Sequence, residues 1–427
     1  MTTTTTTLTP RISLGREHWL PPTTADATTA GGTSLRIRTL EATAELAGAV
    51  LDRCGITRIA DVTDLDVLGI PVFNSCRPDA APGLNTVTSG KGTTATAARV
   101  SAMMEAIERT WCEPRAAEPP LRASYAELVA AGRPTLDPRR LILRRGHRWT
   151  ERQPLSWWPA RELRSDTEVL IPALAVFTPF PDEYGMFSSN TIGLASGNSP
   201  REALLHGLLE LVEHDCTAFG ETLRGGHRIR SGTLPAEAQE LVARFEGAGI
   251  QVQVFGYVNE IGIPTVFVTT DDTHSEDGLL INGGAGCHPD PTVALSRALT
   301  EAAQSRLNVI SGAREDLNGQ VHRRHASYEE MRKMLHTWSA GRSELDFGEL
   351  PNSTTGRVEG DLRLVLDGLG TAGLDLVFAT ELAPPDLPFS VTQVIVPGIE
   401  NHHNDPARLG TRLHASMVGA GLARSPR

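Results

Sequence analysis

The chain has 427 residues, of which 40% are hydrophobic and 21% are charged, with 40 glycines, 28 prolines and a formal net charge of −11 at pH 7. These totals are typical of a folded globular protein, and no apolar run approaches the ~20 residues of a membrane span. The negative charge argues against broad nucleic-acid binding, so we expect neither nucleic acid nor a membrane as a partner.

The chain opens with MTTTTTTLTPR, which lacks the basic start and apolar stretch of a secretory signal. We expect residues 1–30 to form a disordered Thr-rich tail. No linker divides residues 31–420, which we treat as one domain. The five cysteines lie far apart without a C-x-x-C pair, which predicts neither a zinc site nor a disulfide framework and favours a reducing cytoplasm: Cys54, Cys76, Cys112, Cys216 and Cys287.

Three apolar segments that carry glutamates predict helices, and they share a weak internal repeat. When Glu105, Glu210 and Glu301 are aligned, each has small residues seven and three positions before it and a polar residue three positions after it. The small residues are Ala98, Ala203, Ala294, Ala102, Gly207 and Ala298, and the polar ones are Glu108, Glu213 and Gln304. A glycine-bearing stretch precedes each helix. We expect the small residues to let each helix pack closely on a sheet or on another of the three helices, and the polar stripes to face a shared cleft.

Segments rich in β-branched residues and bounded by Gly, Pro or Asp predict strands: EVLIPALAVF, IQVQVFGYV, IPTVFVTTDD, LDLVFATEL and FSVTQVIVPGIE. Some alternate in polarity and others are continuously apolar, which predicts an α/β (α+β) fold with a mixed sheet covered by helices. The charged stretch of residues 311–350 predicts an exposed helical insertion.

The carboxylates of the first two helices predict a metal site. At about 100° per residue, one stripe of the second helix holds Asn198, Glu202, His206, Glu210 and Glu213. On the first helix, Ser101, Glu105 and Glu108 share a face. Facing helices would bring five carboxylates and an amide to one space, where their charges repel unless a multivalent cation neutralises them. The competing interpretation is a set of solvated helix faces with ordinary charge pairs.

Oxygen ligands of this kind suit Mg²⁺, which usually also binds substrate phosphates, so the pattern favours a nucleotide. Phosphates also need cations. Arg297 lies four residues before Glu301, the position that Ser101 and His206 take on the other helices. Lys91 and Arg36 are further candidates. The SGKG segment does not have the spacing of a Walker A loop.

Four separated segments resemble motifs of the YcaO family, in order: SGKGTTATAARVSAMMEAIERTW, GLASGNSPREALLHGLLELVEHD, GAGCHPDPTVALSRALTEAAQSR, and VIVPGIE followed by RLGTR. The resemblance covers residues 35–412. It implies the family's ATP-binding fold with three related acidic helices, and ATP and Mg²⁺ as cofactors. It implies metal binding by Glu105, Glu108, Asn198, Glu202, Glu210 and Glu213, and nucleotide contacts by Arg36, Thr43, Lys91, Ser101 and Arg297.

Family members that modify peptides use ATP to phosphorylate a backbone amide oxygen, after which a nucleophile adds and phosphate leaves. The resemblance therefore implies O-phosphorylation of a backbone amide in a ribosomally made precursor peptide. Many azoline-forming members end in a Pro-x-Pro-x-Pro tail, whereas this sequence ends in GLARSPR. Because the family core fills almost the whole sequence, we expect no fused leader-binding domain. This favours thioamide formation, with a separate TfuA-like or leader-binding partner, over azoline or amidine formation. A homodimer is also consistent with the family.

Two alternatives of other classes stay open. An accessory protein that retains the fold would bind without turnover, although the complete acidic set argues against a decayed site. A di-iron oxidase would also explain paired glutamates, but it expects Glu-x-x-His where the second helix reads E-x-x-E-H. His206 and His214 depart from the Gln and Arg common in the family. No residue is assigned as the catalytic base.

Overall fold

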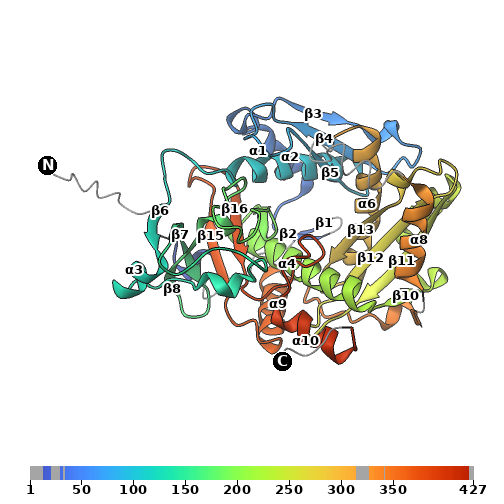
Figure 1. The fold of residues 1–427 in the computed structure, drawn as a ribbon. Coiled ribbons are helices and arrows are strands. Elements are labelled where there is room, and N and C mark those ends of the chain that lie inside the picture. The colour runs from blue at the N-terminus through green and yellow to red at the C-terminus, as the bar shows by residue number, and fades with distance from the viewer. Residues whose placement is uncertain (1–12, 21–28, 32–33, 314–326, 341, 423–427) are drawn as a thin grey trace.

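The computed structural model describes residues 13–20, 29–31, 34–313, 327–340 and 342–422, and Figure 1 shows how its elements are arranged. Within these residues the strands form four sheets. The fold is α+β, as the sequence predicted. All of the sheet pairings are antiparallel except one, in which β10 (His227–Ile229) runs parallel to β14 (Glu344–Leu345).

A three-stranded sheet comes first along the chain. Its strands lie in the order β3 (Arg58–Asp61), β4 (Val72–Cys76) and β5 (Val87–Lys91). Helix α2 (Ala95–Trp111) packs on this sheet, and α1 (Leu40–Gly48) packs on α2. A hairpin leads into α1 and consists of β1 (Thr29–Gly31) and β2 (Ser34–Arg36). In the part of the chain that the structure describes, β5 pairs only with β4 and is therefore an edge strand.

The six-stranded sheet draws on both halves of the chain. Its order is β6 (Leu121–Ser124), β7 (Pro154–Glu162), β15 (Phe378–Glu381), β16 (Ser390–Ile395) and β9 (Leu194–Gly197), and β8 (Thr167–Pro172) also pairs with β7. The short helix α3 (Tyr125–Ala130) follows β6. Helix α4 (Pro200–Leu223) packs on β9 and β16, and α9 (Val358–Thr371) packs on α4.

The five-stranded sheet has the order β13 (Asn282–Cys287), β12 (Thr265–Asp272), β11 (Ile250–Tyr257), β10 and β14. Helix α6 (Pro291–Ile310) packs on β13 and β12, and α5 (Ala236–Gly247) packs on β11. Two further helices are α8 (Tyr328–Ser339) and α10 (Thr411–Gly419), the latter against α4. As Figure 1 shows, α4 runs between the six-stranded sheet and the five-stranded sheet.

Glycines on three strands allow the three related helices to approach their sheets closely. A Cβ atom on Gly90 of β5 would lie 1.9 Å from the backbone nitrogen of Ala102, and one on Gly197 of β9 would lie 2.5 Å from that of Ala203. On β13, a Cβ atom at Gly284 would lie 2.2 Å from the carbonyl oxygen of Ala298. The glycine-bearing stretches that precede the helices are therefore strands. The prediction that small residues pack the helices closely on sheets is confirmed.

Four of the predicted strand segments contain β11, β12, β15 and β16. The fifth, EVLIPALAVF, forms β8 only as far as Pro172 and continues as a 3-10 turn over Ala173–Ala175. All five cysteines are free. No helix among the described residues has both the length and the apolar character needed to span a bilayer.

The disorder expected over residues 1–30 does not hold for residues 13–20. Trp19 is fully buried and its Nε1 donates a hydrogen bond to Thr392 Oγ1. Residues 1–12 and 21–28 lie outside the described residues. In the segment predicted as an insertion, residues 314–326 also lie outside the described residues. Of the rest of that segment, residues 328–339 form helix α8 and β14 joins the five-stranded sheet. The boundaries of a 31–420 domain and of a 311–350 insertion stay predictions.

Candidate functional site

A cavity of about 300 Å³ lies where the three related helices meet the β1–β2 hairpin and α1. Its wall includes all five residues that were predicted to bind the nucleotide: Arg36, Thr43, Lys91, Ser101 and Arg297. Four of the six predicted metal ligands also line it: Glu105, Glu108, Asn198 and Glu202. Glu210 and Glu213 do not line it and lie further along α4.

One corner of this nucleotide cavity is built around the buried carboxylate of Glu202. Its Oε2 accepts hydrogen bonds from Asn198 N at 2.9 Å and Nδ2 at 3.1 Å, and its Oε1 accepts one from the backbone of Ile37. Arg36 Nη1 lies 3.8 Å from the same carboxylate, and Thr43 donates to Asn198 Oδ1 at 3.1 Å. These contacts tie the segment after β2 to the start of α4. Many of the lone pairs of Glu202 are therefore already used by protein donors.

A second corner gathers carboxylates that repel one another. Burial raises the pKa of Glu108 well above its usual value, and the neighbouring charges of Glu105 and Glu210 raise it further. The backbone N–H of Ser196 donates to Glu108 at 2.7 Å. Glu105 is paired with Arg109, whose Nη2 lies 2.8 Å from Oε1. A cation here would relieve repulsion that the protein itself only partly compensates.

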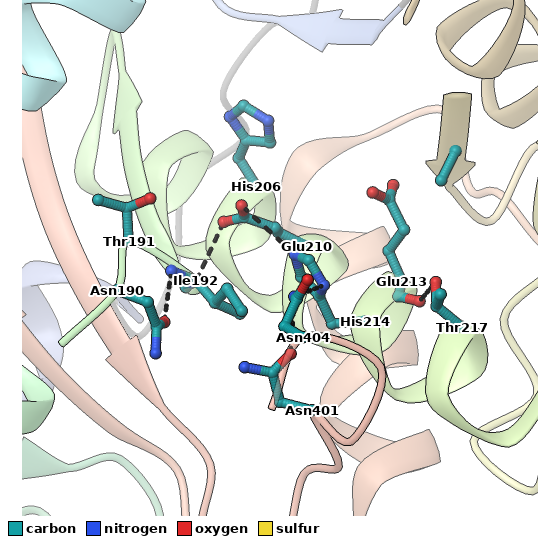
Figure 2. A network of polar contacts seen from close by, with 12 residues as sticks. Asn190, Thr191, Ile192, His206, Glu210, Glu213, His214, Thr217, Asn401 and Asn404 are labelled. Carbon is teal, nitrogen blue, oxygen red and sulfur yellow. Dashed lines mark hydrogen bonds and ion pairs between the residues drawn. The ribbon is translucent and has the colours of Figure 1, made fainter. Parts of the chain in front are cut away.

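Glu210 and Glu213 leave α4 at different points, and their carboxylates lie apart in Figure 2. Glu210 accepts a hydrogen bond from Gly193 N at 3.0 Å, next to Thr191 and Ile192. Burial, with the charge of Glu213, raises the pKa of Glu210 to about 8. Burial, with the charge of Glu301, raises the pKa of Glu213 to about 7. Both groups therefore hold their protons more tightly than free carboxyl groups do.

Cationic side chains also line the cavity. Lys91 forms an ion pair with Glu301, and Arg297 Nη2 lies 3.3 Å from His206 Nε2. Burial lowers the pKa of His206 well below its usual value, and Arg297 and Arg36 lower it further, so the imidazole is neutral and accepts from Arg297. Arg297 Nε and His206 Nδ1 are both buried without a hydrogen-bond partner among the described residues. An anion in the cavity would satisfy the arginine N–H.

These residues fit a magnesium–nucleotide better than a closed metal centre. Among the described residues, no three His, Cys, Asp or Glu side chains converge to hold a metal ion by themselves. Mg²⁺ is usually held by one or two carboxylates and by substrate phosphates, so an open carboxylate site beside cations suits it.

The family model described as YcaO cyclodehydratase, ATP- and Mg²⁺-binding, matches residues 89–400. The chain belongs to the YcaO family. An uncharacterized protein of Methanothermobacter thermautotrophicus is 39% identical over 378 residues, which cover 87% of this chain and 96% of the relative. A Rhizobium leguminosarum bv. trifolii protein, described by its place in the tfuA 3′ region, is 32% identical over 379 residues. The aligned residues cover 86% of this chain and 89% of the relative.

Solved structures share the YcaO fold. The structure of YcaO from Methanopyrus kandleri bound with AMPPCP and Mg²⁺ has a TM-score of 0.74 and 25% identity, covering 89% of this chain and 96% of that one. A heterocyclase in complex with substrate and cofactor has a TM-score of 0.79 and 21% identity, covering 97% of this chain and 59% of the heterocyclase. ATP and Mg²⁺ are the cofactors of the family, and membership supports ATP-dependent peptide modification in general terms.

The nucleotide cavity is also lined by residues to which the sequence interpretation gave no role in binding, namely Arg38, Ser89, Thr300 and Gln304. Gln304 was visible in the repeat at the position of Glu108 and Glu213, and Arg38 lies two residues after Arg36. Beside Glu210, His214 Nδ1 lies 3.0 Å from Nε2 of His403, a residue of the C-terminal loop. Figure 2 shows Asn404 of that loop next to His214. No pattern in the sequence had linked this loop to α4.

Proposed function

We propose that this YcaO protein uses ATP and Mg²⁺ to phosphorylate a backbone amide oxygen of a ribosomally made peptide. The observation that carries the proposal is the charge pattern of the nucleotide cavity. Arg36, Lys91 and Arg297 line this cavity together with Glu105 and Glu108. A polyphosphate with its cation complements both kinds of group, because its oxygens suit the cationic side chains and its metal suits the carboxylates.

ATP would supply the phosphoryl group that turns the amide oxygen into a good leaving group, and Mg²⁺ would neutralise its charge. Arg297 offers its unpaired Nε–H to a phosphate oxygen, and the neutral His206 fixes the guanidinium through Nη2. Glu105 and Glu108 would hold the cation, and Glu108, whose pKa is raised by burial, would give up its proton to the solvent as the cation binds. Glu202 holds Arg36 at the cavity wall. Positioning and charge therefore provide most of the catalysis.

We further propose that the product is a thioamide. A sulfide nucleophile adds to the activated amide carbon, and phosphate departs with the original oxygen, so that sulfur replaces oxygen and ATP becomes ADP and phosphate. The relative described by its place in the tfuA 3′ region supports a TfuA-like partner that recruits the peptide or delivers sulfur. Azoline formation is the second candidate, because the family description reads cyclodehydratase. There a side chain of the peptide itself adds, and one water is lost.

Calorimetric titration with AMPPCP, with and without Mg²⁺, tests the nucleotide site directly. We expect saturable binding that requires Mg²⁺ and that is lost in Glu105→Gln. Absence of binding in the wild-type protein, with or without the partner, would contradict the proposal. Mass spectrometry of the peptide product then separates exchange of oxygen for sulfur from loss of water. Nucleotide binding without peptide-stimulated hydrolysis would instead support an accessory protein.

A further inference from the structure

A second cavity of about 250 Å³ opens from the acidic end of the nucleotide cavity. The two cavities share Ser89, Glu105 and Gln304 as lining residues. Beyond these, the second cavity is lined mainly by the loop before β5, by β5 itself, and by the last turns of α6. A molecule that occupies it therefore reaches the same carboxylate that was assigned to the metal. This is where a phosphoryl acceptor has to approach.

One wall of the second cavity is the outer edge of β5. Arg77 N donates to Thr86 O and Gly92 N donates to Pro71 O, and these two bonds set the register with β4. Because backbone groups in an antiparallel pair point alternately toward and away from the partner strand, Val87 and Ser89 direct their N–H and C=O groups away from β4. Gln304 confirms this direction, since its Nε2 donates to Ser89 O at 2.6 Å.

The side chains around this edge form hydrogen bonds rather than an apolar surface. Ser89 Oγ donates to Asn308 Oδ1 at 2.6 Å, and the hydroxyl of Thr88 is buried without a partner among the described residues. Gln304 occupies the place on Ser89 that a neighbouring strand would take. An edge strand with polar surroundings is a template for pairing with another extended chain. The backbone of a peptide is the ligand that uses both features.

We propose that the peptide substrate docks in an extended conformation along the outer edge of β5. The inference rests on the proposed function. The peptide backbone pairs with Val87 and displaces Gln304 from the carbonyl oxygen of Ser89. The amide to be activated lies beside Glu105 at the junction of the two cavities. Main-chain pairing of this kind gives affinity with little dependence on side-chain sequence. Alternate peptide side chains point to opposite faces, so only every second residue meets the lining of the cavity.

Photocrosslinking tests this docking site in the complete protein, loaded with AMPPCP and Mg²⁺. The probe is a mixture of nonapeptides with benzoylphenylalanine at the central position and random residues elsewhere. A second mixture carries N-methyl groups on alternate backbone amides, which removes the donors that pairing needs. We expect crosslinks of the first mixture to residues 83–89 and 304–313. The N-methylated mixture should give a yield about threefold to tenfold lower, the effect of one or two lost hydrogen bonds.

The matched variants are Val87→Pro and Val87→Thr. Proline removes the outward N–H without breaking the ladder to β4, whereas threonine keeps it. We expect Val87→Pro to lower the crosslink yield about threefold to tenfold and Val87→Thr to leave it unchanged. Calorimetric binding of AMPPCP should be unchanged in both variants, which shows that the fold and the nucleotide site are intact.

Two results would overturn the docking proposal while the proposed function stands: equal yields from both peptide mixtures, or no crosslink in residues 83–89 from wild-type protein that binds AMPPCP. The N-methyl comparison uses the wild-type chain alone, so a variant that fails to fold does not decide the test. Failure of the wild-type protein to bind AMPPCP would count against the proposed function instead.

Discussion

At the scale of single residues, three buried glutamates determine how the charge in and beside the nucleotide cavity changes with pH. Glu108, Glu210 and Glu213 all have raised pKa values, because burial and their mutual repulsion favour the protonated form. A metal ion needs the ionised form, so binding has to displace protons. If these carboxylates hold the metal as proposed, the affinity for a magnesium–nucleotide should depend on pH near neutrality, where free carboxyl groups are already fully ionised.

We predict that the affinity for Mg²⁺–AMPPCP rises between pH 6.5 and 8.5, by up to about tenfold per pH unit where one proton leaves. Calorimetry in two buffers of different ionisation enthalpy measures both the dissociation constant and the protons released. Glu210→Gln removes the group whose pKa is about 8 and should flatten the upper part of this profile. A wild-type affinity that does not change over this range would contradict the role of these carboxylates.

Arg297 is predicted to be the main phosphate contact. Its Nε has no partner among the described residues, and its Nη2 is held by His206. Arg297→Ala should weaken AMPPCP binding by about tenfold to a hundredfold, the value of a charged hydrogen bond. The control is Arg363→Ala, since Arg363 is exposed on α9 and does not line the cavity. Calorimetric titration measures the affinity of both variants for AMPPCP. An equal loss of affinity in the two variants would indicate a nonspecific charge effect and contradict the role of Arg297.

At the scale of elements, a strand glycine under each related helix fixes the distance between helix and sheet. A Cβ atom on Gly286 of β13 would lie 2.1 Å from Ala294 O and 2.9 Å from Arg297 Cβ. Neither neighbour can move without shifting α6. The close packing thus places Arg297 as well as stabilising the sheet.

We therefore predict that Gly286→Ala lowers the free energy of unfolding by about 2–3 kcal/mol and also weakens nucleotide binding. Gly247→Ala serves as the control, because no heavy atom lies within 4 Å of the Cβ it would add at the exposed end of α5. That variant should be neutral or stabilising by up to about 1 kcal/mol. Urea denaturation followed by circular dichroism measures both, and an unaffected Gly286→Ala would show that α6 has room to shift.

The sequence predicted the three helices and most of the β-branched strands because their local patterns agree with their environments. It did not predict β5, β9 or β13 as strands, since glycine and serine have low strand propensity and suggest loops. Those segments are strands because they pair with β4, β16 and β12, and because only glycine allows the helices to approach. Neither reason is local in sequence.

The site was predicted in composition more than in geometry. A helical wheel gives direction around an axis but not position along it. Glu202 and Glu213 share a stripe of α4, yet 11 residues at about 1.5 Å each separate them by roughly 16 Å. One cavity of about 300 Å³ does not reach both. Their shared role as metal ligands stays a prediction. The sequence had already grouped Arg36, Lys91 and Arg297 as candidate phosphate contacts, and the fold brings all three to one cavity.

At the scale of the whole molecule, the same carboxyl groups couple stability to pH. A carboxyl group whose pKa is raised on folding binds more protons in the folded state than in the unfolded state. It therefore destabilises the protein once the pH rises above the pKa that the group has in the unfolded chain. For Glu210 this loss begins above about pH 4.5 and is complete above about pH 8. The metal-free protein should therefore lose stability across that window.

We predict that Glu210→Gln raises the free energy of unfolding of the metal-free protein by about 1–2 kcal/mol at pH 8.5 and has no such effect at pH 5. Because 30% of the Glu210 side chain is exposed, solvent keeps the effect in this low range. Thermal unfolding at both pH values measures it. Adding Mg²⁺ and AMPPCP should stabilise the wild-type protein more than the variant, and the opposite order would contradict a metal-binding role for Glu210.

The ion pair between Lys91 and Glu301 has a consequence for turnover. The ammonium group already holds an internal anion, so an incoming nucleotide has to compete with Glu301 for it. A triphosphate with its larger charge competes better than a diphosphate does. Once the terminal phosphoryl group had left, Lys91 would return to Glu301 and ADP would be held more weakly. If Lys91 contacts the nucleotide as proposed, the carboxylate of Glu301 would act as an internal competitor that favours product release and selects triphosphates over diphosphates.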